Sequence, residues 1–172
     1  MPPAGFSAAT VLDDVKAGAS LQSVADAHSM EEIVGAVQDA LTGLRLGVSS
    51  LDEGPLHRVA GLELWSIAEI AGHALRMDEA AHAIARSLAV GQRPGVRLPY
   101  GEAGSAGATR ELLLDGIRAA EERLAATRVL AAGGPTFAHQ ELGELTARGW
   151  ILFIGLHAAA HLHQAAAVVR AR

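Results

Sequence analysis

The chain of 172 residues is long enough to form one domain around a single sizeable hydrophobic core. Its 14 Lys and Arg residues against 19 Asp and Glu residues give a net charge of −5 without any basic stripe, which argues against nucleic-acid binding. The sequence contains no Cys, which excludes disulfides, Cys-based zinc sites and a thiolate nucleophile supplied by the chain itself.

Four long helices are predicted, because Ala and Leu dominate the composition and β-branched runs are scarce. Residues 1–28 are expected to precede them as a short helical extension in two segments. The ranges predicted for the four long helices are about 30–50, 66–90, 109–132 and 146–172. No internal repeat is visible, so the prediction is one all-α domain over residues 1–172, with residues 1–28 as its extension.

Two of the helix starts carry a capping box, in which Ser is followed three residues later by Glu. Ser29 with Glu32 opens the first long helix, and Ser66 with Glu69 opens the second. Residues 91–108 are rich in Gly, Pro and Ala and lack periodicity, so they form a long connection between the second and third helices. Such a crossover allows the third helix to run parallel to the second.

The last helix requires a test for a membrane span, because residues 149–169 carry no charge. Three His and one Gln make this stretch weakly hydrophobic, and polar groups are costly inside a membrane. We therefore predict a helix buried within the bundle or between subunits, and its excess of apolar surface predicts a symmetric homodimer. The N-terminus lacks a basic start followed by an apolar run, so a cytoplasmic protein is expected.

A cluster of histidines on the last helix is the strongest chemical signal. His157 and His161 are four residues apart, so both imidazoles lie on one helix face and can bind one metal ion. Gln164 shares that face, whereas His163 lies roughly 200° around the helix from His161 and should point elsewhere. A third ligand must come from a neighbouring helix, and His73, which sits in an apolar segment of the second helix, is the best candidate.

The histidines also fit other interpretations. His157 and His161 could be ordinary buried His residues that have hydrogen-bond partners and bind no metal. His82 is a poorer third ligand, because it lies about half a turn out of phase with His73. Glu79 and His82 match the Glu-x-x-His of di-iron bundles, but the last helix supplies no acid after Glu144, which argues against a di-iron site.

Three motifs in this chain resemble those of the DinB-like metalloenzyme superfamily. Residues 65–73 resemble its Trp-Ser-x-x-Glu-x-x-x-His signature, and residues 137–150 resemble the entry to its last helix. His157, His161 and Gln164 match its two C-terminal metal ligands and the Gln that follows them. The resemblance covers about residues 30–170, and residues 1–28 fall outside it.

The resemblance implies an up-down-down-up bundle that is often a homodimer. It also implies a site in which His73, His157 and His161 bind nickel, zinc or a similar divalent ion. Characterised members of the family include S-transferases that use bacillithiol or mycothiol and mycothiol-dependent maleylpyruvate isomerases.

Three ligands leave an open coordination position, which is typical of a catalytic metal. The leading hypothesis is transfer of a low-molecular-weight thiol, such as bacillithiol or mycothiol, to a small electrophile. The alternatives are a metal-dependent hydrolase and a non-catalytic protein that binds a metal or small ligand. Gln164 and Arg76 are candidates to contact the co-substrate or substrate, and Glu69 either orients the His73 ring or only caps its helix.

Overall fold

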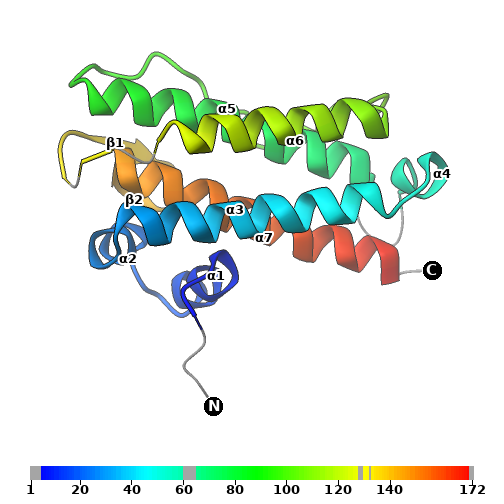
Figure 1. Cartoon of the computed structure of the whole chain (residues 1–172), viewed down its shortest axis with the longest axis horizontal. Helices are drawn as coiled ribbons and strands as arrows, with labels where there is room; N and C mark the ends of the chain where they lie inside the picture. The colour runs from blue at the N-terminus through cyan, green and yellow to red at the C-terminus, as the bar shows by residue number, and fades with distance from the viewer. Residues whose placement is uncertain (1–4, 60–64, 128–129, 132, 171–172) are drawn as a thin grey trace.

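The structure is a computed structural model that describes residues 5–59, 65–127, 130–131 and 133–170. Four long helices form a bundle, in which α3 and α7 run in one direction and α5 and α6 run in the other (Figure 1). Their bounds are Met30–Ser49 for α3, Ile67–Ala89 for α5, Arg110–Ala125 for α6 and Ala147–Arg170 for α7. The expected all-α, up-down-down-up bundle is therefore confirmed, with a crossover that returns the chain between the parallel helices α5 and α6.

The two predicted capping boxes are present and set the starts of α3 and α5. The Ser29 hydroxyl accepts from the Glu32 amide at 3.2 Å, and the Glu32 carboxylate accepts from the Ser29 amide at 2.8 Å. Ser66 and Glu69 make the same pair of bonds at 3.3 Å and 2.8 Å. Each box satisfies amides that have no partner in the first turn of a helix, which explains why the predicted starts hold.

Two local features differ from the prediction. Helix α6 ends at Ala125, seven residues before the expected end, because the Thr127 amide and hydroxyl both donate to the Leu124 carbonyl and close a tight turn. The stretch expected as a loop before α7 instead contains a hairpin of two strands, β1 (Thr136–His139) and β2 (Gly143–Thr146). Its turn returns through Gly143 at a φ of 77°, which glycine adopts without strain.

The N-terminal extension covers the outer face of α7. It consists of α1 (Ala8–Lys16) and α2 (Leu21–Ala27), which both pack against α7 (Figure 1). The Gln22 side chain of α2 accepts from the Thr146 amide at 2.8 Å, immediately before α7 begins. Within α7, a Cβ added at Gly155 would lie 3.3 Å from the Ala8 side chain, so α1 and α7 approach closely. No purpose for residues 1–28 could be predicted from the sequence, and in the structure α1 and α2 of this segment pack against α7.

Helix α7 is the core helix of the bundle. Among the described residues it alone is long and apolar enough to cross a membrane, yet half of its most apolar window is buried by other parts of the protein. It packs most extensively against α5 and α3, and α1 and α2 cover much of the remainder. Burial inside the bundle therefore accounts for its lack of charge, and the described residues give no positive sign of a membrane association. A cytoplasmic location stays a prediction.

The homodimer also stays a prediction. It was predicted from the apolar surface of α7, and the structure shows which part of that surface remains uncovered. Because α1 and α2 cover part of α7, the apolar surface left lies near the C-terminal end of that helix. A groove of about 370 Å³ there is lined mainly by apolar side chains, including Leu51, Ile67, Leu162 and Val169. A second copy of the chain is expected to pack on this groove.

A charge placed in the groove should therefore dissociate the dimer. Ala166, which lines the groove, is half-buried, and Ala166→Glu would bury a carboxylate in the interface without a partner. Light scattering at micromolar concentration should report a dimer for the parent protein and a monomer for this variant. Ala83→Glu, at a half-buried position of α5 outside the groove, is the control and should remain dimeric. A monomeric parent protein would contradict the prediction.

Candidate functional site

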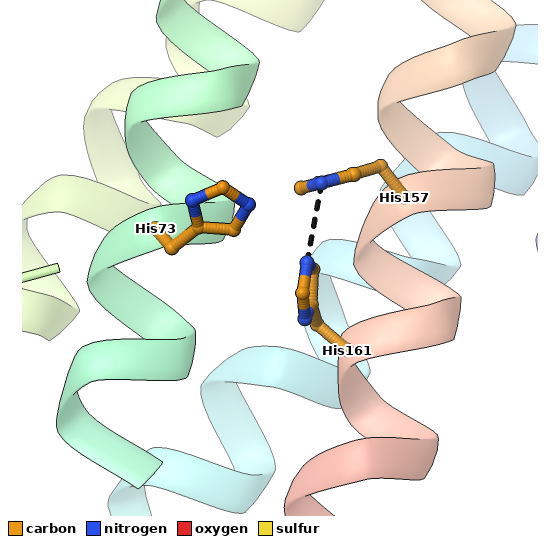
Figure 2. A group of neighbouring side chains, drawn as sticks. All are labelled: His73, His157 and His161. Atoms are coloured by element: carbon orange, nitrogen blue, oxygen red, sulfur yellow. Dashed lines mark hydrogen bonds between the residues drawn. The ribbon is translucent and has the colours of Figure 1, made fainter. Parts of the chain in front are cut away.

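Three histidines from two helices meet in the middle of the bundle. His73 on α5 faces His157 and His161, which lie one turn apart on α7 (Figure 2). The ring centroid of His73 lies 5.1 Å from that of His157 and 4.9 Å from that of His161. The ring centroids of His157 and His161 are 4.4 Å apart. One nitrogen from each ring can be chosen so that all three lie within 4.8 Å of one another. The three His are thus positioned to hold a metal ion.

Hydrogen bonds fix the orientation of two of these rings. The Nδ1 of His73 lies 2.7 Å from the backbone carbonyl of Glu102, and the Nδ1 of His161 lies 2.7 Å from Oε1 of Gln164. Both partners are acceptors, so in each neutral ring Nδ1 carries the proton and Nε2 carries the lone pair. Metal-binding His residues commonly donate such a hydrogen bond from the ring nitrogen that does not bind the metal. In His73 and His161 it turns Nε2 toward the centre of the triad.

The spacing within the triad suits a common ligand set. The Nε2 atoms of His157 and His161 are 3.1 Å apart. Two nitrogens bound to one tetrahedral ion at about 2.1 Å would be separated by about 3.4 Å. The observed separation is close to this value, so the two α7 rings need only a small adjustment to share one ion.

Burial favours the neutral forms of His73 and His157. Desolvation lowers the pKa of His73 below its ordinary value, and the positive charge of nearby Arg76 lowers it further. Desolvation also holds the pKa of His157 well below its ordinary value, with repulsion from the charged forms of His161 and His73 adding to the effect. Metal ions bind the neutral imidazole, so the lowered pKa values of His73 and His157 favour binding of a cation at neutral pH.

The crossover between α5 and α6 positions the acceptor for His73. The Gly104 amide donates to the Glu69 carbonyl at 2.9 Å, and a Cβ added at Gly104 would lie 2.5 Å from that oxygen. Only a glycine lets the crossover approach α5 so closely, and the approach brings the Glu102 carbonyl to His73. The Glu69 carboxylate caps α5 through Ser66, which matches the simpler of its two expected roles.

Sequence reasoning missed Glu102, because a backbone carbonyl acts without regard to residue type. The only signal was indirect: a long Gly-rich connection follows the helix that carries His73. The missed residue also explains the position of Arg76, whose guanidinium donates to the carbonyls of Glu102 and Ala103. A contact between Arg76 and a substrate stays a prediction, as does one between Gln164 and a co-substrate.

The remaining histidines named from the sequence lie outside the triad. His163 is exposed on another face of α7, where the helical period placed it. His82 is buried, and its Nδ1 lies 3.1 Å from the Asp78 carbonyl, one turn back on α5. Glu79 is exposed, so the Glu-x-x-His pair does not point into the bundle together.

A cavity of about 240 Å³ opens beside the triad, and His73 and His157 form part of its wall. Tyr100 from the crossover and His139 from the hairpin line it as well, and the sequence had assigned His139 no role. The His139 side chain is 5% exposed, and its Nδ1 accepts from the backbone amides of Glu141 and Leu142 at 3.1 Å and 3.3 Å. The neutral ring therefore carries its proton on Nε2, which has no hydrogen-bond partner among the described residues.

This environment predicts an acid-sensitive fold. Burial lowers the pKa of His139 below its ordinary value of 6.5, and a second proton would enter at Nδ1 and break both amide bonds. The unfolded chain takes up that proton at a higher pH than the folded chain, so the free energy of unfolding should fall as the pH drops below 6.5. Urea titrations of metal-free protein from about pH 7 to about pH 5 should show the fall, and a shallower one in His139→Phe. An equal slope in both proteins would contradict this assignment.

Comparison with known proteins agrees with this geometry. No protein with a curated description matches the chain, and no solved structure matches it. The model of the DinB superfamily matches residues 21–165, which include α2, all four bundle helices up to the last turns of α7, and the complete His triad. The match spans most of the sequence, so the chain belongs to the DinB superfamily.

Proposed function

We propose that this protein is a metal-dependent enzyme that binds one divalent ion through His73, His157 and His161. The observation that carries the proposal is the convergence of three imidazoles, two of them oriented by hydrogen bonds that their Nδ1–H groups donate. Nickel and zinc are the proposed ions, because both accept imidazole ligands readily. Membership of the DinB superfamily supports this donor set.

The proposed reaction is the transfer of a low-molecular-weight thiol to an electrophilic small molecule. A divalent ion held by three protein ligands would supply a Lewis acid that lowers the pKa of a thiol bound at its open position. The chain has no Cys, so the thiol comes from a small co-substrate, for which bacillithiol and mycothiol are the proposed candidates. The cavity beside His73 and His157 offers a place for the electrophile next to the thiol.

The residues of the chain have distinct parts in this proposal. Glu102 and Gln164 hold the rings of His73 and His161 so that Nε2 faces the ion. His73 is buried and His157 and His161 are partly buried, and this reduced exposure to solvent would strengthen the interaction between an ion and its ligands. Contact with the co-substrate is the role proposed for Arg76, which lies one turn after His73, and for Gln164, which contacts His161.

Metal content is the first test. The purified protein should contain about one divalent ion per chain by elemental analysis, and His161→Ala should lower the affinity for that ion greatly. His163→Ala is the matched control on the same helix. It should leave the affinity for the ion nearly unchanged, because the His163 side chain is exposed on another face of α7. Equal metal content in the parent protein and His161→Ala would overturn the proposal.

Turnover with thiols is the second test. Metal-loaded protein mixed with a generic electrophile and bacillithiol, mycothiol or glutathione should form the thioether product, and a chelator should abolish turnover. His73→Ala should also abolish it while circular dichroism shows an intact bundle. Hydrolysis of esters or amides without any thiol turnover would favour a metal-dependent hydrolase, which uses the same site with water. Metal binding without either activity would favour a non-catalytic binding protein.

A further inference from the structure

The cavity between the crossover, the hairpin turn and α7 has a chemical character of its own. Its wall combines the apolar side chains of Met77, Leu142, Phe153, Leu156 and Ala160 with a few polar groups beside the His triad. We propose that this cavity binds a neutral carbonyl compound about the size of one substituted ring. The identification of this cavity as the site of the electrophile rests on the proposed function. The binding of a neutral carbonyl compound in the cavity does not depend on that function.

The volume sets the size of the ligand. A buried apolar cavity of about 150 Å³ is enough to bind benzene. The cavity here, at about 240 Å³, has room for one ring with a small substituent. Leu142 and Phe153 line the cavity with an aliphatic and an aromatic side chain, both of which pack well against a ligand ring. The ring centroid of Phe153 lies 5.3 Å from that of His157. A ligand seated there would contact the triad directly.

The charges around the cavity favour a neutral ligand. No Lys or Arg is among the described residues that line it, and the one carboxylate in the wall belongs to Glu141. The nearest guanidinium on α5, that of Arg76, is engaged with the Glu102 and Ala103 carbonyls and with the Glu102 carboxylate. A ligand carboxylate would therefore lose its hydration without gaining a cationic partner from the protein.

Two hydrogen-bond donors indicate a carbonyl group on the ligand. His139 has its proton on Nε2, and this buried N–H lacks an acceptor among the described residues. The Tyr100 hydroxyl accepts from the Gln140 amide at 3.4 Å, which leaves its own hydrogen available. An unpaired buried N–H is costly, and a ligand carbonyl oxygen would relieve that cost.

Calorimetry with a set of probe molecules tests the proposal on the full-length protein, both as purified and after treatment with a chelator. Benzamide and benzoate have the same size and differ in charge, 2-naphthamide adds a second ring, and toluene lacks the carbonyl. Benzamide should bind about tenfold more tightly than benzoate in the chelated protein, because no protein cation compensates the carboxylate. Benzamide should also bind about tenfold more tightly than 2-naphthamide, because the second ring of 2-naphthamide overfills the cavity.

Variants locate the binding and identify the donor. Leu142→Trp fills the cavity and should weaken benzamide binding about tenfold, whereas Leu112→Trp at a 63% exposed position of α6 is the matched control and should not change it. His139→Phe keeps a ring but removes the donor, so the preference for benzamide over toluene should fall about fivefold. This ratio responds to the hydrogen bond and not to a general loss of packing.

Several results would overturn the inference. They are the absence of binding by every probe, benzoate binding as tightly as benzamide after chelation, or equal effects of the two Trp variants. If His139→Phe does not fold, the probe series and Leu142→Trp still decide the question. Failure here is separable from failure of the proposed function, since metal content and its loss in His161→Ala are measured without any probe.

Discussion

The hydrogen bond between His73 and the Glu102 carbonyl is the contact on which the geometry of the triad depends. It ties the buried face of α5 to the crossover, the same segment that allows α6 to run parallel to α5. The contact requires a close approach that only Gly104 permits, because any Cβ there would collide with the backbone of α5. The crossover therefore has two consequences at once: it determines the topology of the bundle and the direction of a metal-binding lone pair.

The burial of α7 explains both its composition and its chemistry. The helix is uncharged over most of its length because α1, α2, α3 and α5 surround it. The same surroundings desolvate His157 and hold its pKa well below the ordinary value, so the ring stays neutral. Trp150 on α7 donates to the Phe137 carbonyl at 3.2 Å and so attaches the hairpin to this helix. That attachment brings His139 to the cavity beside the triad.

Features that depend on local spacing were predictable from the sequence. The capping boxes gave the starts of α3 and α5, and the four-residue separation of His157 and His161 put both rings on one face. The contact of Glu102 with His73 was not predictable, because it joins two distant segments through a backbone carbonyl that any residue type supplies. The orientation of His139 was not predictable either, because it depends on backbone amides in the turn of the hairpin. The early end of α6 and the four-residue strands were missed for a related reason: a single turn through Thr127 or Gly143 decides them.

The distribution of charge around the site separates the two reactants of the proposed reaction. Imidazole binds a metal ion in its neutral form, so a divalent ion held by the three His would bring two uncompensated positive charges to the centre of the triad. In the proposed reaction an anionic thiolate would be attracted to that point, since no Lys or Arg is among the described residues that line the cavity. A neutral carbonyl compound would gain from the apolar wall and from the N–H of His139, whether or not an ion is bound. The thiolate and the electrophile would therefore occupy adjacent positions without competing for one, which is the arrangement that a bond-forming transfer between them requires.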